Sequence, residues 1–222
     1  MRCALTTLAL AAQALTAAPA ITAQGTARER GWSLQVSIGA PFNLPAPVTI
    51  RQAGSPDLRF TARWETRPFE PPLYYAVRIG RWDRAGAWEI ELVHHKLYLA
   101  HPPTEVQRFD VSHGFNLLLV NRAIAVNGVV LRGGPGIVVA HPENTVRGLP
   151  LPWSRTLLGS GYHLAGPALQ LAAGRRWDGP GPFRLGVEAK VTGAWVRVPV
   201  AGGRASVPNV ALHALAGVGL GP

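Results

Sequence analysis

The sequence is short of cysteine, lysine and charge. Its 222 residues include one cysteine, Cys3, so loss of an N-terminal segment would exclude disulfides and cysteine-based metal sites. Only 15% of the residues are charged, against about 25% in typical soluble proteins. Lysine occurs only at Lys96 and Lys190, yet the 22 basic residues outnumber the 12 acidic ones. The excess indicates either a compositional bias toward arginine or attraction to a polyanion, such as nucleic acid or anionic lipid headgroups.

Long apolar runs are also missing beyond the N-terminus, although 47% of the residues are hydrophobic. No stretch of about 18–20 consecutive apolar residues follows residue 23, which argues against a helical membrane protein. Long amphipathic helical patterns with caps are absent from the same region. The apolar content in turn argues against intrinsic disorder.

The N-terminus has the features of a secretory signal. Arg2 supplies the positive charge, residues 4–18 supply the apolar segment, and residues 18–23 offer small-residue cleavage sites. We therefore predict a cleaved signal peptide over residues 1–23 and a periplasmic lead over residues 24–31. Residues 32–222 are expected to form one exported domain. Export, with no nucleic-acid motif in the chain, argues against nucleic acid as a partner.

Apolar residues at every second position predict eight β-strands. In residues 183–192 the apolar positions alternate with Arg184, Gly186, Glu188, Lys190 and Thr192. Related patterns occur in residues 32–39, 73–82, 88–99, 111–122, 129–140, 162–174 and 207–220. Residues 58–64 also alternate, but a ninth membrane strand would break the even parity. We place them as a hairpin extension in the first external loop.

The connections alternate between short and long. Short turns are expected at residues 83–86, 127–128 and 178–181, and long proline-bearing loops at residues 40–72, 100–110, 142–160 and 197–206. This alternation is typical of a transmembrane β-barrel with short periplasmic turns. The predicted fold is therefore all-β: an eight-stranded antiparallel up-and-down barrel, monomeric, in the bacterial outer membrane. A soluble exported barrel is the alternative.

In this fold the apolar faces contact lipid and the polar faces line a narrow lumen. The apolar face of residues 111–122 carries Phe115, Leu117 and Leu119. The predicted lumen charges are Arg78, Glu89, Glu91, Arg132, Arg184, Glu188 and Lys190, with His213. Aromatic girdles are expected from Trp32, Tyr75, Trp82, Trp88, Tyr98, Trp177 and Trp195, which lie near strand ends.

Short motifs are spread over roughly residues 58–220. They are Trp64-Glu65, Glu91-x-x-His94-x-Lys96-x-Tyr98, Gly114-x-Asn116, Tyr162-x-Leu164-x-Gly166-Pro167-x-x-Gln170 and Glu188-x-Lys190-x-Thr192. Together they resemble the lipid A oxidase group of outer-membrane barrels. The resemblance implies an eight-stranded barrel and oxygen-dependent oxidation of the proximal glucosamine of lipid A. Expected partners are lipid A or lipopolysaccharide, membrane lipid and the outer-membrane assembly machinery.

The candidate site residues lie on four of the predicted strands. Glu91 and His94 offer a carboxylate and an imidazole for a divalent metal or for acid–base catalysis, with Glu188 as a further catalytic candidate. The substrate-binding candidates are Lys96, Asn116, Gln170 and Lys190. A structural interpretation stays open for each of two residue pairs. His94 and Lys96 would reach the lipid interface and hydrogen-bond sugar phosphates there. Independently, Glu188 and Lys190 would form a buried ion-pair network.

Two other functions stay open. A lipid A deacylase of the esterase type needs serine, histidine and a carboxylate in contact, but Ser112 and His113 are adjacent strand positions and should face opposite sides. A non-enzymatic structural, adhesive or lipopolysaccharide-binding barrel would use loop arginines. These are Arg51, Arg59, Arg63, Arg67, Arg108, Arg147 and Arg155.

Overall fold

Every regular element in the computed structural model is a β-strand, over the residues it describes, 30–222. The predicted signal peptide and nearly all of the periplasmic lead lie outside the described residues. None of the described residues belongs to a helix long and apolar enough to cross a membrane.

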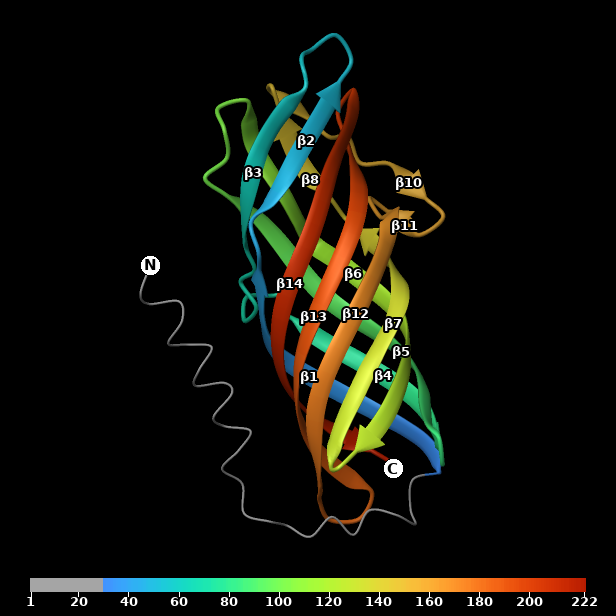
Figure 1. The fold of residues 1–222 in the computed structure, drawn as a ribbon. Helices are drawn as coiled ribbons and strands as arrows, with labels where there is room; N and C mark the ends of the chain where they lie inside the picture. Colours follow the sequence, from blue (N-terminus) through green and yellow to red (C-terminus); the bar gives the residue numbers. More distant parts are fainter. Residues whose placement is uncertain (1–29) are drawn as a thin grey trace, which may run out of the picture.

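The strands form one closed antiparallel barrel (Figure 1). The strands are β1 (Gly31–Asn43), β2 (Ala46–Gln52), β3 (Leu58–Glu65), β4 (Tyr75–Asp83), β5 (Gly86–Ala100), β6 (Val106–Val126), β7 (Val129–Ala140), β8 (Glu143–Val146), β12 (His163–Asp178), β13 (Phe183–Val200) and β14 (Gly203–Leu220). Three short strands lie between β8 and β12: β9 (Leu149–Pro150), β10 (Arg155–Thr156) and β11 (Gly159–Ser160). In the barrel wall β1 continues into β2, β3 into β4 and β7 into β8. Each of these pairs counts as one continuous wall strand, which we call a stave, so the wall has eight staves, as predicted.

The first and last staves close the ring. β1 pairs with β14 from Leu34 opposite Leu220 to Asn43 opposite Ala211. The pairing resumes above, where Thr49 of β2 lies opposite Ser206 of β14. Closure leaves no unpaired strand edge at membrane depth, which a spanning sheet requires.

The external half of the barrel contains much more strand than the sequence predicted. The predicted loops at residues 40–72 and 197–206 are largely β2, β3 and the upper parts of β13 and β14. Residues 58–64 form the expected hairpin extension, because β3 pairs with β2 around Ala62 and Ala46. Prolines and arginines obscure the alternation in these segments, so the sequence pattern alone predicts loops there.

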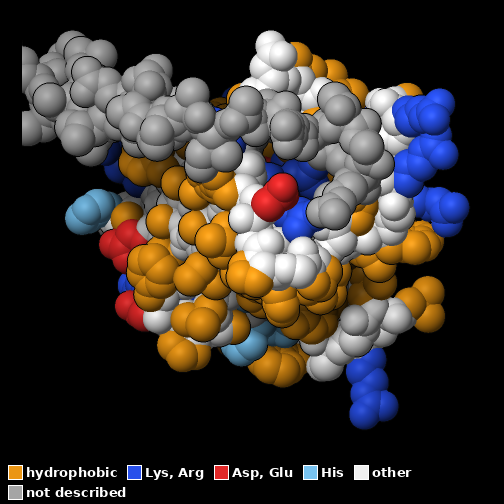
Figure 2. All heavy atoms as spheres, turned by 90° about the horizontal axis from the view of Figure 1, so that it is seen from below, with side chains coloured by type: hydrophobic (Ala, Val, Ile, Leu, Met, Phe, Trp, Pro, Cys, Tyr) orange, Lys and Arg blue, Asp and Glu red, His pale blue; other side chains and the backbone are white. Residues whose placement is uncertain are grey.

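The half of the barrel away from the external hairpins, which we call the lower or membrane half, has an apolar outer wall. Between Phe183 and Trp195 every outward residue of β13 is apolar, and Figure 2 shows hydrophobic side chains around the outside of the barrel. This part of β13 rises roughly 41 Å at about 3.4 Å per residue, or about 30 Å along the axis for a tilt of about 40°. That height matches the hydrocarbon core of a bilayer.

Aromatic residues mark the two edges of this band. Trp32 and Trp88 are exposed at the lower edge and Trp195 at the upper edge, as girdle residues should be. The prediction that Trp82 belongs to the girdle was wrong. Its side chain is buried inside the barrel, where the guanidinium carbon of Arg176 lies 4.5 Å from its ring centre.

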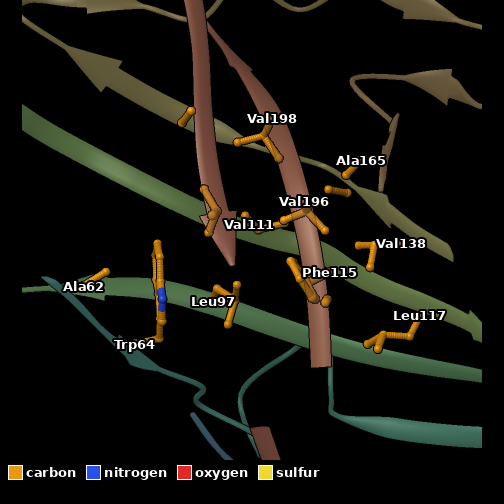
Figure 3. Packing of buried hydrophobic residues seen from close by; sticks show 14 of the residues in the cluster. Ala62, Trp64, Leu97, Val111, Phe115, Leu117, Val138, Ala165, Val196 and Val198 are labelled. Carbon is orange, nitrogen blue, oxygen red and sulfur yellow. The ribbon is translucent and has the colours of Figure 1, made fainter. Parts of the chain in front are cut away.

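The interior has two layers. In the external half it is an apolar core that includes Trp64, Leu97, Val111 and Val198 (Figure 3). Phe115, Leu117 and Leu119 point into the interior, so the prediction that this face contacts lipid was wrong. Residues 117–120 are apolar on both faces, and Leu118 and Val120 are the ones exposed on the outer wall. In the membrane half the interior is charged.

Candidate functional site

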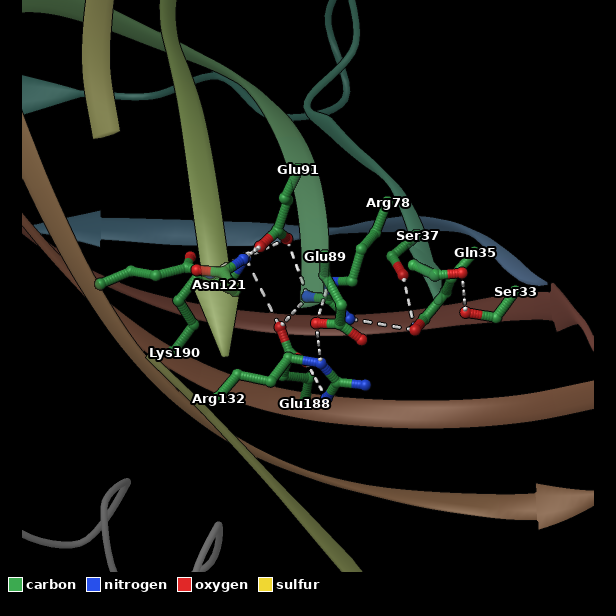
Figure 4. Close-up of polar contacts among 12 residues, drawn as sticks. Ser33, Gln35, Ser37, Arg78, Glu89, Glu91, Asn121, Arg132, Glu188 and Lys190 are labelled. Atoms are coloured by element: carbon green, nitrogen blue, oxygen red, sulfur yellow. Dashed lines mark hydrogen bonds and ion pairs between the residues drawn. The ribbon is translucent and has the colours of Figure 1, made fainter. Parts of the chain in front are cut away.

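The lumen charges form one continuous network centred on Glu91 (Figure 4). Its Oε1 lies 2.8 Å from Arg78 Nη2 and also contacts Lys190 Nζ. Its Oε2 accepts hydrogen bonds from Asn121 at 3.0 Å and Gln170 at 2.6 Å. The Glu91 side chain is fully buried, so all of its acceptor capacity is used within the barrel.

Glu188 joins the two arginines of the network. Its Oε1 lies 2.8 Å from Arg78 Nη2, and its Oε2 lies 2.8 Å from Arg132 Nη1. Arg132 in turn donates to Glu89 at 2.9 Å. The cations Arg78, Arg132 and Lys190 thus balance the carboxylates Glu89, Glu91 and Glu188. Glu188 and Lys190 face the lumen, as the alternation predicts. The two predicted catalytic carboxylates, Glu91 and Glu188, are therefore both inside the barrel and away from the lipid.

His94 lies on the opposite side of the wall from Glu91. Its ring stacks on Tyr75 at 5.1 Å, and its Nδ1 donates to Asn116 Oδ1 at 2.8 Å. Residues three positions apart on a strand face opposite sides, so the structure does not form the predicted metal pair of Glu91 and His94. His94 and Asn116 do come together, just above the lipid-facing residues of β5 and β6.

Lys96 is covered from outside by the segment that joins β3 to β4. Its Nζ donates to the backbone oxygen of Glu70 at 2.7 Å and lies 5.7 Å from the Tyr98 ring centre. The predicted substrate-binding lysine is therefore a buried contact with this segment. Of the other three substrate-binding candidates, Gln170 and Lys190 belong to the lumen network, and Asn116 is on the outer face.

A second polar cluster was missed by the sequence analysis. His113 on β6, His141 after β7 and Glu143 on β8 place one ligand atom each within 4.8 Å of one another. His113 Nδ1 lies 2.7 Å and His141 Nδ1 3.9 Å from Glu143 Oε1. We call these three residues the imidazole–carboxylate cluster. The spacing of His141 and Glu143, two positions apart in one extended segment, was the available signal.

Gly114 explains why strand alternation did not reveal the cluster. Its φ of 133° is unfavourable for any other residue, and its backbone oxygen accepts from the His141 backbone nitrogen at 3.0 Å. The irregularity brings Ser112 and His113 to the same carboxylate: Ser112 Oγ is 3.3 Å from Glu143 Oε1 and 3.3 Å from His113 Nδ1. The prediction that these neighbours face opposite sides was wrong.

This arrangement is not a serine esterase triad. In a triad the serine contacts one imidazole nitrogen and the carboxylate contacts the other. Here Ser112 and Glu143 both contact Nδ1 of His113. The geometry therefore lacks the proton path that esterase chemistry requires.

Arginines gather on the outer face of the external half, where β13, β14, β2 and β3 lie side by side. Arg197, Ser206, Thr49 and Arg59 form one row across these four strands. Arg204 and Arg51 face each other in the row above. We call Arg51, Arg59, Arg197 and Arg204 the arginine patch.

The patch carries an excess of positive charge. Arg51 and Arg59 each lie 3.2 Å from Asp57, whose pKa is lowered because its carboxylate accepts hydrogen bonds from Arg59 and Arg51. Among the described residues no ion-pair partner approaches Arg197 or Arg204. Two of the other predicted loop arginines are ion-paired outside the patch: Arg67 pairs with Glu65, and Arg108 pairs with Asp110 and Glu143.

An apolar groove opens directly below the arginine patch, at the seam between the first and last staves. It has a volume of about 290 Å³. Its lining includes Pro45, Pro47, Trp195, Pro208 and Val210. Proline has no backbone N–H to donate, so the β1–β14 ladder ends at this level and the wall is hollowed.

No protein-family model and no curated protein sequence matches this chain significantly. Among solved structures, outer-membrane protein AlkL in lipid bilayers has a TM-score of 0.50 at 14% identity, covering 91% of this chain and 94% of that chain. Neisserial surface protein A has a TM-score of 0.43 at 8% identity, covering 86% and 97%. OprG from Pseudomonas aeruginosa has a TM-score of 0.42 at 12% identity, covering 88% and 97%.

The likeness to AlkL concerns the fold alone. It agrees with the closed eight-stave ring of this structure. The chain is a transmembrane β-barrel of the bacterial outer-membrane type.

Proposed function

We propose that the barrel binds lipid A of lipopolysaccharide from the external leaflet. The observation that carries the proposal is the arginine patch above an apolar groove. Arg204 lies directly opposite Arg51, and like charges in this position repel. A phosphate would relieve the repulsion, because guanidinium groups bind phosphate oxygens in pairs of hydrogen bonds.

The positions of the arginine patch and the apolar groove relative to the apolar outer band support a lipid ligand. Arg197 stands two positions above Trp195 on β13, which is about 5–7 Å above the edge of the apolar band. Phosphates of the outer leaflet lie at this level, and acyl chains lie below it. Lipid A carries both groups, so one molecule would place a phosphate on the patch and a chain in the groove.

The test is a binding titration of the detergent-solubilised barrel with lipid A. The double variant Arg197→Ala/Arg204→Ala is expected to bind at least about tenfold more weakly, because charge-assisted hydrogen bonds each contribute about 1.5–3 kcal/mol. Arg84→Ala, an exposed arginine at the turn between β4 and β5, is the matched control and should bind as the wild type does. Equal affinity for dephosphorylated lipid A would contradict the proposal.

A second candidate is oxidation of the proximal glucosamine of lipid A, which the resemblance to the lipid A oxidase group implies. The hydrogen-bonded pair of His94 and Asn116 supports it, because both side chains point outward at headgroup level, where the His94 side chain is 6% exposed. The test is mass spectrometry of lipid A from aerobic cells with and without the gene. A modified glucosamine that disappears in His94→Gln would support the oxidase, and an unchanged profile would exclude it.

A further inference from the structure

We infer that the imidazole–carboxylate cluster is a binding site for a divalent transition-metal ion of the zinc class. Two imidazoles and one carboxylate are the donor set of many such sites, which leave a further position open. The inference does not depend on lipid A binding, because the cluster lies on β6, β8 and the link between β7 and β8, whereas the arginine patch lies on β13, β14, β2 and β3.

The distances suit a metal with small side-chain adjustments. Around a tetrahedral ion with bonds of about 2.1 Å, the ligand atoms lie about 3.4 Å apart. In the cluster, Glu143 Oε1 lies 2.7 Å from His113 Nδ1 and 3.9 Å from His141 Nδ1. An ion between the three atoms would therefore need shifts of about 1 Å, which side-chain rotations supply.

His141 provides the second observation. Its side chain is only 4% exposed, and within the described residues its Nδ1 has no hydrogen-bond partner. A buried polar atom without a partner is costly, so such atoms call for a ligand. This nitrogen faces the Glu143 carboxylate, which is where an ion would sit.

The surroundings hold His141 in this orientation. Its ring packs against Trp153 at 5.3 Å and Tyr162 at 4.9 Å. A Cβ at Gly161 would lie 2.4 Å from His141 Nε2, so a larger residue there would displace the ring. These contacts aim Nδ1, not Nε2, at the carboxylate.

Arg108 fixes the carboxylate from the other side. Its Nη2 contacts Glu143 Oε2, and its Nε lies 2.7 Å from Asp110 Oδ2. The other carboxylate oxygen, Glu143 Oε1, therefore points toward the two histidines. Such support of a ligand by its neighbours is typical of metal sites. The His113 side chain is 55% exposed, which provides an entry path for the ion.

The test is a calorimetric titration of the tag-free, folded barrel in detergent with Zn²⁺. One equivalent should bind, and His113→Gln and Glu143→Gln should each weaken binding by at least about tenfold. His101→Gln, an exposed histidine outside the cluster, is the matched control and should leave the affinity unchanged. The mobility of folded barrel in unheated gels shows that each variant is folded.

Co²⁺ gives an independent readout of the ligands. Bound in place of Zn²⁺, it should produce visible absorption bands of a low-coordinate site, and these should be lost in Glu143→Gln. The inference is wrong if wild type binds no stoichiometric Zn²⁺, or if both cluster variants bind it as tightly as His101→Gln. Such a result would leave the direct contact between His113 Nδ1 and Glu143 Oε1, 2.7 Å apart, as the role of the cluster.

Discussion

Glu91 is the residue on which the lumen network most depends. Its carboxylate contacts Arg78, Lys190, Asn121 and Gln170 while fully buried. Glu91→Gln would remove one of the two carboxylates that Arg78 and Lys190 share and leave three buried cations with two carboxylates, and an uncompensated buried charge of this kind costs about 3–5 kcal/mol. We expect a loss of this size in the free energy of unfolding, measured with urea in lipid vesicles.

The matched control is Glu65→Gln. Glu65 lies 3.1 Å from Arg67, but both side chains are about half exposed. Exposed pairs contribute about 0–1 kcal/mol, so this variant should unfold much as wild type does. Equal stability of the two variants would show that the lumen charges do not hold the staves together.

At the scale of elements, the external hairpins have a core of their own. Trp64 on β3 packs against Phe109 on β6, with ring centres 6.1 Å apart. Trp64→Ala would open a cavity there, at a cost of about 3–5 kcal/mol. Hydrogen exchange should speed up in β2, β3 and the start of β6 and stay slow in β1. Phe69→Ala, at an exposed position, is the control and should leave both unchanged.

The sequence predicted the membrane half of these elements better than the external half. Alternation was clear where one face meets lipid and the other meets charge, as around Glu188 and Lys190. It failed at residues 117–120, which are apolar on both faces, because periodicity alone cannot say which face is inside. The pattern also does not predict the imidazole–carboxylate cluster, because Gly114 breaks the alternation next to His113 and because the pairing of β6 with β8 brings Glu143 to it.

At the scale of the whole molecule, the barrel reverses its polarity along its axis. In the lower half the wall is apolar outside and charged inside, whereas the external half has an apolar core and arginines outside. The change occurs at the level of Trp195, His94 and Asn116. The low charge content and the absence of an apolar run thus have one cause: apolar residues occupy alternate positions around a closed wall.

This reversal predicts that the cost of an outward-facing arginine depends on its height. Leu171 of β12 is 66% exposed and lies within the apolar band, opposite Val191. Leu171→Arg is expected to lower the free energy of unfolding in lipid vesicles by about 2–4 kcal/mol, the cost of a cation near the bilayer centre. Thr61→Arg, on the outer face of β3 in the external half, should change it by less than about 0.5 kcal/mol. Equal free energies of unfolding for the two variants in vesicles would show that the bilayer does not surround the lower half alone. The arginine patch would then not lie at the level of the lipid phosphates.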